Sequence, residues 1–126
     1  MTNYRMTNDE CAERAEQQAF DLEERTAAFG ESVIDFAQTI MLNPIITPLV
    51  SQLIKAATSI GANYCEADDA ESKKDFRHKI GLCRKESRET KYWFRMIARG
   101  APYAKEAARP LWHEANELNL IFSKIR

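Results

Sequence analysis

Apolar residues recur at helical spacing in four segments of the chain, and the first segment spans residues 21–42. Positions three, four or seven residues apart lie on one face of a helix, so this spacing predicts an amphipathic helix. Its apolar stripe consists of Leu22, Thr26, Phe29, Val33, Phe36 and Ile40. Asn43-Pro44 should end the helix, because proline disfavours helical backbone in the residue before it.

The second segment begins at Thr47-Pro48, which fit an N-cap and a first helical residue. The pattern predicts a helix that continues to about Glu66. Its apolar face consists of Leu49, Leu53, Ala56, Ile60 and Tyr64. Small residues such as Ala57 and Gly61 would let a neighbouring helix approach closely.

The third segment starts at Ser72, which resembles the first residue of a capping box with Asp75 in place of glutamate. Its helix should continue to about Arg99, because Gly100-Ala101-Pro102 is typical of a helix end. The predicted core face consists of Phe76, Ile80, Cys83, Ser87, Thr90, Phe94 and Ile97.

The fourth segment starts between Ala104 and Pro110, and the earlier start fits less well because proline is tolerated only in the first turn of a helix. Its buried stripe is Leu111, Leu118, Phe122 and Ile125. Four helices with short loops predict an all-α fold, an antiparallel up-down-up-down four-helix bundle over residues 20–126. Residues 1–19 are expected to form a loosely held helical extension.

The composition is that of a single helical domain. The 126 residues include only four glycines and four prolines, and no apolar run is long enough to span a membrane. Cys11, Cys65 and Cys83 form an odd number of cysteines without metal-ligand spacing. We interpret them as reduced thiols of a cytoplasmic protein.

Charge is distributed unevenly, although the net charge is only −1. Residues 1–42 hold three basic and nine acidic side chains, whereas residues 71–99 hold ten basic and four acidic ones. This asymmetry indicates either charge-complementary contacts between copies or a basic surface on a neutral protein. A dedicated nucleic-acid-binding protein would usually be more basic overall.

Basic residues of the third helix repeat at three, four or seven positions on the side opposite the core. We call this set the basic stripe: Lys73, Arg77, Arg84, Arg88, Lys91, Arg95 and Arg99. One interpretation is a solvated face that pairs with nearby glutamates. A second is a surface that follows the phosphate backbone of a nucleic acid, with only Tyr92 close enough to stack on bases. A third is that acidic residues of the first helix meet the stripe, within a subunit or between subunits.

A second apolar arc lies beside the core face of the third helix, and we call it the interface flank. It holds Leu82, Trp93 and Met96, together with Glu86 and Glu89. The core face and this flank span roughly 200°, whereas packing into one core needs little more than about 100°. The surplus predicts an oligomer interface. The alternative is a wide core that both neighbouring helices contact.

Polar residues also repeat at helical spacing along the second helix, and we call them the polar row: Gln52, Ser59, Asn63 and Glu66. Polar groups at the edge of a core must find hydrogen-bond partners. The row is therefore interpreted, with Glu86 and Glu89, as an inter-helix hydrogen-bond layer that sets register. The alternative is a ligand site, and an arginine from another subunit could also pair with these groups.

No residues form a recognisable catalytic or metal site in the sequence. His78 and His113 are isolated, and neither belongs to a His-x-x-x-His or Glu-x-x-His pair. Cys65 and Cys83 lie near apolar stripes and are interpreted as small core residues. There is no glycine-rich phosphate loop. The sequence predicts a protein that is not an enzyme and that has no metal or other cofactor.

The segment from Gln52 to Trp93 resembles the bacterial four-helix-bundle proteins related to the ribosomal RNA intervening-sequence proteins. The shared elements are Gln-Leu-x-x-Ala-x-x-Ser-Ile-x-x-Asn-x-x-Glu, then Ser-x-x-Asp-Phe and Glu-Thr-x-Tyr-Trp. The matching residues are Gln52, Leu53, Ala57 (one position later than Ala56), Ser59, Ile60, Asn63, Glu66, Ser72, Asp75, Phe76, Glu89, Thr90, Tyr92 and Trp93. With Asp21–Thr26, the resemblance covers about residues 20–125.

The resemblance implies a left-handed four-helix bundle that assembles as a ring-like homopentamer. Related accessory proteins of diversity-generating retroelements are basic pentamers that bind nucleic acid and a reverse transcriptase. This chain departs from them in its near-neutral charge and in its acidic loop at Ala67, Asp68 and Asp69. We therefore expect a non-catalytic, homo-oligomeric interaction or scaffold protein, with a further protein partner as an option. A nucleic-acid-binding accessory protein is the alternative.

Overall fold

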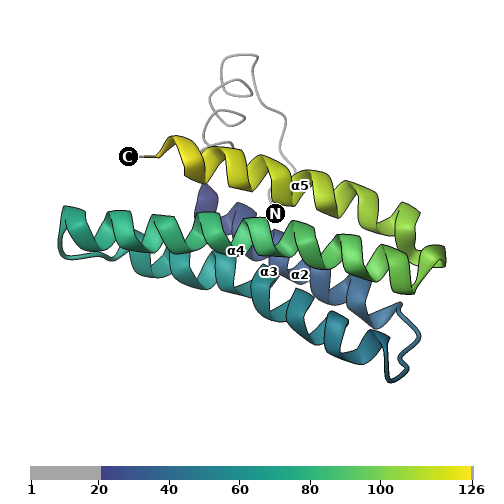
Figure 1. Cartoon of the computed structure of the whole chain (residues 1–126). Helices are drawn as coiled ribbons and strands as arrows, with labels where there is room; N and C mark the ends of the chain where they lie inside the picture. Colours follow the sequence, from purple (N-terminus) through teal and green to yellow (C-terminus); the bar gives the residue numbers. More distant parts are fainter. Residues whose placement is uncertain (1–20, 126) are drawn as a thin grey trace, which may run out of the picture.

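A computed structural model describes residues 21–125, and four α-helices account for most of them (Figure 1). They are α2 (Leu22–Gln38), α3 (Ile46–Asp68), α4 (Lys73–Gly100) and α5 (Lys105–Lys124), with a short 3-10 helix, η1 (Pro102–Ala104), before α5. The described residues include no strand, so the predicted all-α class is confirmed. The extension predicted for residues 1–19 lies outside the described residues.

The helices pack together in a way that is consistent with a bundle, and α3 and α4 make its most extensive contact. α3 also contacts α2, and α4 also contacts α5. α2 meets α5 along a narrower seam, whereas the backbones of α2 and α4 lie farther apart and Phe36 and Phe94 join these two helices across the core. In Figure 1 the sequence colours run in opposite directions along successive helices. No ion pair joins the acidic α2 to the basic α4 within residues 21–125.

The core is built from the apolar stripes of all four helices. All six stripe residues of the first predicted helix are buried. The rings of Phe36 and Phe94 meet edge to face, with centroids 5.7 Å apart. The predicted core residues that are only half-buried lie at its rim: Leu49, Tyr64, Phe76, Leu111 and Ile125.

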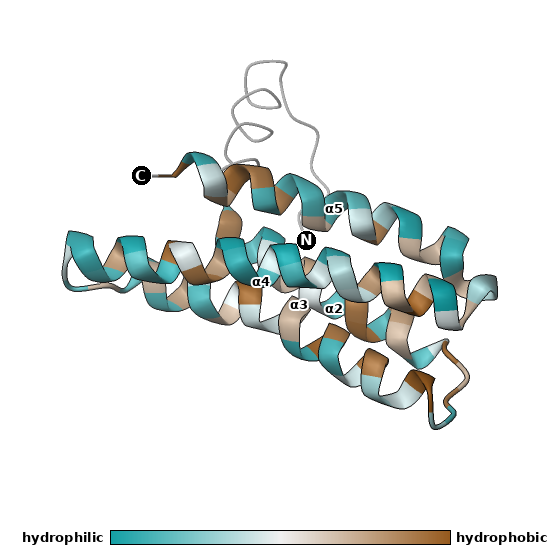
Figure 2. Cartoon of the chain, in the orientation of Figure 1, coloured by the Kyte–Doolittle hydropathy of each residue, from teal (hydrophilic) through white to brown (hydrophobic). Residues whose placement is uncertain are grey.

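The end of α2 differs from the prediction. The helix ends at Gln38 instead of continuing to residue 42, and the hydroxyl of Thr39 donates to the carbonyl of Phe36 at 2.7 Å. Ile40 remains buried after the helix has ended, so the apolar spacing outlasts the helix. The connection to α3 then exposes large apolar side chains, and Figure 2 shows it as a largely hydrophobic loop: Met41, Leu42 and Ile45.

The start of α3 also differs, because an asparagine caps it. The side-chain oxygen of Asn43 accepts hydrogen bonds from the N–H groups of Ile45 and Ile46, both at 2.9 Å. The helix starts at Ile46, so the prediction of Thr47 as N-cap was wrong. Asn43 thus satisfies free N–H groups at the start of the helix, the role that Thr47 was expected to play a few residues later. Pro48 still lies in the first turn, where its missing N–H has no consequence.

The boundaries of α4 agree with the prediction. The hydroxyl of Ser72 accepts a hydrogen bond from the N–H of Asp75 at 3.0 Å and caps the helix. The helix ends at Gly100, which does not have a positive φ. A Cβ at Gly100 would lie 2.6 Å from Cδ1 of Ile46. Glycine here therefore permits close packing against α3 rather than a left-handed cap.

α5 takes the earlier of its two expected starts. It begins at Lys105 and carries Pro110 in its second turn, where proline removes a backbone hydrogen bond. The prediction gave the earlier start less weight for this reason. Burial of Ala108, Ala115 and Leu118 on the same helix offsets that loss. Tertiary packing therefore overrides a local helix-breaking signal.

An ion pair closes the narrow seam between α2 and α5. The guanidinium of Arg25 makes two hydrogen bonds to the carboxylate of Glu114, both at 2.8 Å. Both side chains are roughly one-third exposed, and the paired carboxylate raises the pKa of Arg25. A two-pronged pair of this kind adds geometric specificity to modest energy. The sequence pattern did not reveal it, because the partners are 89 residues apart.

Candidate functional site

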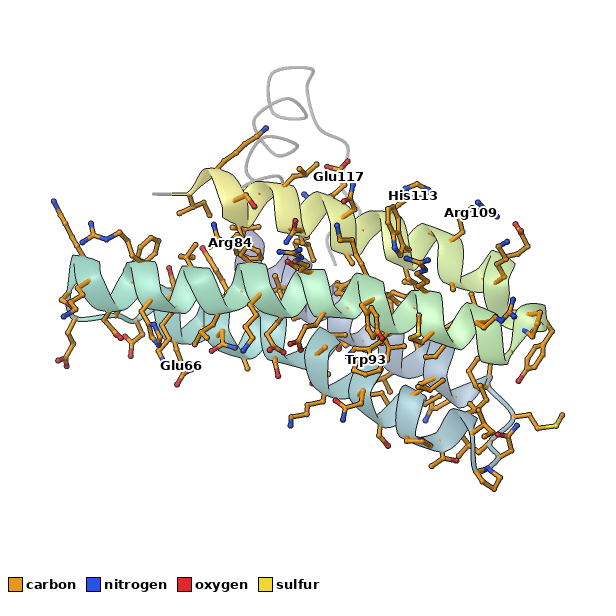
Figure 3. All side chains as sticks on the ribbon, viewed as in Figure 1. Glu66, Arg84, Trp93, Arg109, His113 and Glu117 are labelled. Atoms are coloured by element: carbon orange, nitrogen blue, oxygen red, sulfur yellow. The ribbon has the colours of Figure 1, made fainter. Side chains whose placement is uncertain are left out.

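The interface flank lies on the side of α4 that borders α3. Figure 3 shows Trp93 on this side and Arg84 on the other side of the same helix, next to α5. Leu82, Trp93 and Met96 are half-buried, so each keeps part of its apolar surface in contact with water. Exposed apolar surface of this kind is the usual mark of an interaction site when it is contiguous.

Trp93 has a donor that the described residues do not satisfy. Its indole packs against the edge of the core and meets the ring of Tyr92 edge to face, with centroids 5.0 Å apart. The indole N–H is buried but has no hydrogen-bond acceptor. Leaving such a donor unpaired costs about 1–3 kcal/mol. The flank therefore carries an unmet hydrogen-bonding requirement beside its apolar surface.

The carboxylate of Glu86 is also poorly accommodated. Burial, and then the nearby carboxylate of Glu89, raise the pKa of Glu86 above its usual value. Lys85 and Lys55 oppose the shift, but neither forms an ion pair with Glu86 in the described structure. The interface flank therefore holds a half-buried carboxylate and, seven residues further along the same face, an indole N–H without an acceptor.

The polar row makes mostly local hydrogen bonds. The hydroxyl of Ser59 donates to the carbonyl of Lys55 at 2.6 Å, and the amide of Asn63 donates to the carbonyl of Ser59 at 2.9 Å, both within α3. Of the row, Glu66 alone reaches the neighbouring helix, through Lys79 at 3.3 Å. Gln52 and Glu89 are exposed. The predicted layer is thus reduced, within the described residues, to one exposed ion pair.

Further polar contacts between two helices lie between α4 and α5. The amide of Asn119 donates to the carbonyl of Arg84 at 2.9 Å and to the hydroxyl of Ser87 at 3.1 Å. The ammonium of Lys91 donates to the side-chain oxygen of Asn116 at 3.0 Å. These contacts of Asn116 and Asn119 were not predicted, although a spacing of three residues places both side chains on one face of the helix.

The basic stripe occupies the α5 side of α4 rather than the side opposite the core. Six of its seven residues are exposed, and the exception is Lys91, which is half-buried against α5. Its ammonium also lies over the ring of Trp112, 5.6 Å from the centroid. No stripe residue forms an ion pair with another residue between 21 and 125. Most of the stripe is therefore free to meet another molecule's charge.

No acidic residue of α2 forms an ion pair with the stripe within residues 21–125. Several of them line a different hollow, between α2 and α3, together with small residues such as Gly30 and Ala62. Its acidic residues are Asp21, Glu23, Glu24 and Glu31. Of the three interpretations of the stripe, pairing with these acids within the bundle is not observed between residues 21 and 125, and pairing between subunits stays a prediction.

The chain matches a known protein family over most of its length. The sequence model described as 23S rRNA-intervening sequence protein matches residues 15–124 of the chain. The chain belongs to the 23S rRNA-intervening sequence protein family. The resemblance found in the residues between Gln52 and Trp93 is thereby confirmed. No catalytic family is indicated for this intervening-sequence family member.

A solved structure supports the fold of this intervening-sequence family member. It is the crystal structure of a protein with unknown function from the S23 ribosomal protein family of Bacteroides thetaiotaomicron. The TM-score is 0.69 at 24% sequence identity, over 79% of this chain and 89% of that one. At this identity the likeness shows the fold. No curated protein matches the chain.

The remaining reactive groups of this intervening-sequence family member give no catalytic arrangement. Cys83 is buried, and burial raises the pKa of its thiol to about 12, so the thiol stays protonated at neutral pH. Cys65 is exposed, so its interpretation as a core residue was wrong. Cys11 lies outside the described residues. Within residues 21–125, no cluster of three metal-ligating side chains occurs, and no helix is long and apolar enough to cross a membrane.

Proposed function

We propose that this chain is a non-catalytic scaffold protein of the cytoplasm, an antiparallel up-down-up-down bundle that assembles into a homo-oligomer through the interface flank of α4. The observation that carries this proposal is the partly exposed apolar surface of Leu82, Trp93 and Met96 on one flank of α4. A second copy would cover this surface, beside an indole N–H that has no acceptor within the described structure. Short loops between successive helices favour the antiparallel topology.

Other features of the molecule fit such an assembly. The flank is apolar at its centre and bordered by exposed polar groups, Gln52 and Glu89 among them, as in protein interfaces. The acidic hollow of α2 and α3 lies away from the basic stripe of α4, so one copy's acidic face can meet another copy's basic face. Head-to-tail contacts of this kind form a ring when the rotation between copies closes, and a filament when it does not. The resemblance to the family implies a ring of five.

Light scattering after size-exclusion chromatography tests this proposal. We expect the mass to be a multiple of 14.5 kDa for the full chain. Trp93→Glu should dissociate the assembly, because it places a charge in the centre of the contact. Leu120→Glu, at an exposed apolar residue of α5, adds the same charge outside the flank and should leave the mass unchanged. A wild-type monomer at micromolar concentration would end the proposal.

A second candidate function is binding to the phosphate backbone of a nucleic acid through the basic stripe. The observation that favours it is that six of the seven stripe residues are exposed, and none pairs with an acid of residues 21–125. Closely spaced unpaired cations release counterions from a phosphate backbone when they bind it. This candidate requires the stripe to remain uncovered in the assembly.

Titration with a labelled RNA or DNA strand across salt concentrations tests the second candidate. Affinity should fall steeply with salt, and the double charge reversal Arg84→Glu with Arg88→Glu should abolish binding. The matched control reverses Lys74 and Lys124, which are exposed and outside the stripe. If both double variants weaken binding equally, the attraction is general and the stripe is not the site.

A further inference from the structure

A groove opens where the end of α4 meets the first half of α5. Its volume is about 1060 Å³, close to the upper limit of about 1,000 Å³ for small-ligand sites. Residues of both helices and of η1 line it. The ones that matter here are Arg95, Arg99, Lys105, Arg109, Trp112 and His113. In Figure 3, Arg109 and His113 lie together on α5 at this end of the molecule.

The groove is strongly cationic. Four of its lining side chains are arginine or lysine, and no lining residue is acidic. Arg95, Arg99 and Lys105 form no ion pair with another residue in the described part of the chain. Arg109 pairs at 3.1 Å with Glu106, which is highly exposed, and such a pair is weak. Cations that converge on one hollow without partners favour a ligand with several negative charges.

An aromatic wall distinguishes this groove from the rest of the basic stripe. The indole of Trp112 lines it and is held by two neighbours. The ammonium of Lys91 lies 5.6 Å from the ring centroid, and the ring of His113 meets it edge to face at 5.3 Å. Trp112 lines the groove, whereas Lys91 does not. Fixed aromatic surfaces beside cations are the usual elements of sites that stack a nucleobase.

We propose that this groove binds a nucleoside phosphate, either free or as one unit of a single strand. The base stacks on Trp112, and Arg95, Arg99 and Lys105 hold the phosphates, with Arg109 exchanging Glu106 for the ligand. If the ligand is a strand, this proposal rests on the second candidate function and adds α5 to its surface. Arg95 and Arg99 belong to both sites, whereas Lys105, Arg109 and Trp112 belong to the groove alone.

Fluorescence anisotropy with labelled ATP and a labelled eight-nucleotide thymidine strand tests the proposal on the full chain. Lys105→Glu with Arg109→Glu should weaken binding of either probe at least tenfold. Arg84→Glu with Arg88→Glu makes the same charge change on α4 outside the groove and should leave ATP binding within about twofold. Loss of ATP binding in both double variants alike, or in neither, would overturn the proposal.

A competition experiment tests the aromatic part. Unlabelled pyrophosphate should compete about five- to a hundredfold more weakly than ATP, because it cannot stack on Trp112. Trp112→Phe should retain most of the affinity, and Trp112→Leu should lose it while the circular dichroism melt remains cooperative. Pyrophosphate that competes as well as ATP would overturn the stacking on Trp112.

The two probes distinguish the sources of the nucleotide. Binding of the strand at least a hundredfold tighter than ATP supports a strand, and equal affinities support a free nucleotide. Undetectable binding of both at millimolar concentration in low salt would refute the proposed site. If the strand binds through Arg84 and Arg88 and ignores the groove variants, the second candidate function stands and the groove proposal falls.

Discussion

The two flanks of α4 differ in what they leave unsatisfied. The flank beside α3 buries most of its surface yet holds the unpaired indole N–H of Trp93 and the poorly solvated carboxylate of Glu86. The flank beside α5 exposes cations such as Arg84 and Arg88, which water solvates without difficulty. The difference teaches that buried polar groups without a hydrogen-bond or ion-pair partner indicate an interaction surface better than the number of its charges does.

The largest expected effect on both flanks of α4 is the loss of stability when the core side chain that supports them is removed. Phe94 is fully buried and packs against Phe36, so Phe94→Ala should lower the free energy of unfolding by about 3–5 kcal/mol. Urea denaturation followed by circular dichroism measures it. Tyr92→Ala, at an exposed neighbour two residues away, should change stability by less than about 1 kcal/mol. A similar cost at both positions would contradict the assigned core face.

A loss of stability of intermediate size is expected on the α5 side of α4. Asn119→Ala removes hydrogen bonds to Arg84 and Ser87 and leaves the buried hydroxyl of Ser87 with fewer partners, so it should cost about 1–2 kcal/mol. Asn63→Ala removes one bond within α3 and should cost less than about 1 kcal/mol. Thermal unfolding of the two variants compares the stability that the α4–α5 contact contributes with the stability that the hydrogen bond within α3 contributes. If Asn63→Ala costs more, the inter-helix polar contacts belong to α3 and α4 after all.

The smallest expected effect is a pH dependence of the free energy of unfolding, which arises from Glu86 on the α3 side of α4. Because burial raises the pKa of Glu86 in the folded protein, the folded state binds its proton more tightly than the unfolded state does. Its ionisation therefore lowers stability as pH rises through the carboxyl range. Glu86→Gln should stabilise the protein at pH 7 by less than about 1 kcal/mol, since the group is partly solvated.

Unfolding curves at several pH values test this sign. The advantage of Glu86→Gln over wild type should shrink as pH falls below the usual carboxyl pKa, where both states hold the proton. Glu31→Gln, at an exposed carboxylate of α2, is the matched control and should show little change with pH. A Glu86→Gln protein that is less stable than wild type at pH 7 would show that the carboxylate has a favourable partner.

Local signals predicted the helices well where one residue carries the information. Ser72 caps α4 as expected, and every residue of the first stripe is buried. The start of α3 was missed because Asn43 and Thr47 are both good caps, and only the backbone path after Pro44 decides between them. The second turn of α5 accepts Pro110 because the burial of neighbouring side chains compensates for the lost backbone hydrogen bond. Helix propensity does not include this burial.

The candidate sites were harder to predict from sequence. Periodicity placed Trp93 and the basic stripe on their own faces of α4, since spacing fixes which residues share a face. It could not tell that Ser59 and Asn63 would bond within α3, or that Asn116 and Asn119 would join α5 to α4. A polar side chain near a helix edge has local and distant partners, and only the neighbouring helix determines which one it reaches.

The sequence by itself determined the helical class, the four amphipathic segments and the family, because each depends on short-range spacing or on residues in fixed order. Tertiary structure alone decided that Phe36 of α2 meets Phe94 of α4, that Arg25 meets Glu114, and that the ends of α4 and α5 form a cationic groove lined by Trp112. These features join residues distant along the chain. Their geometry exists only once the helices have packed.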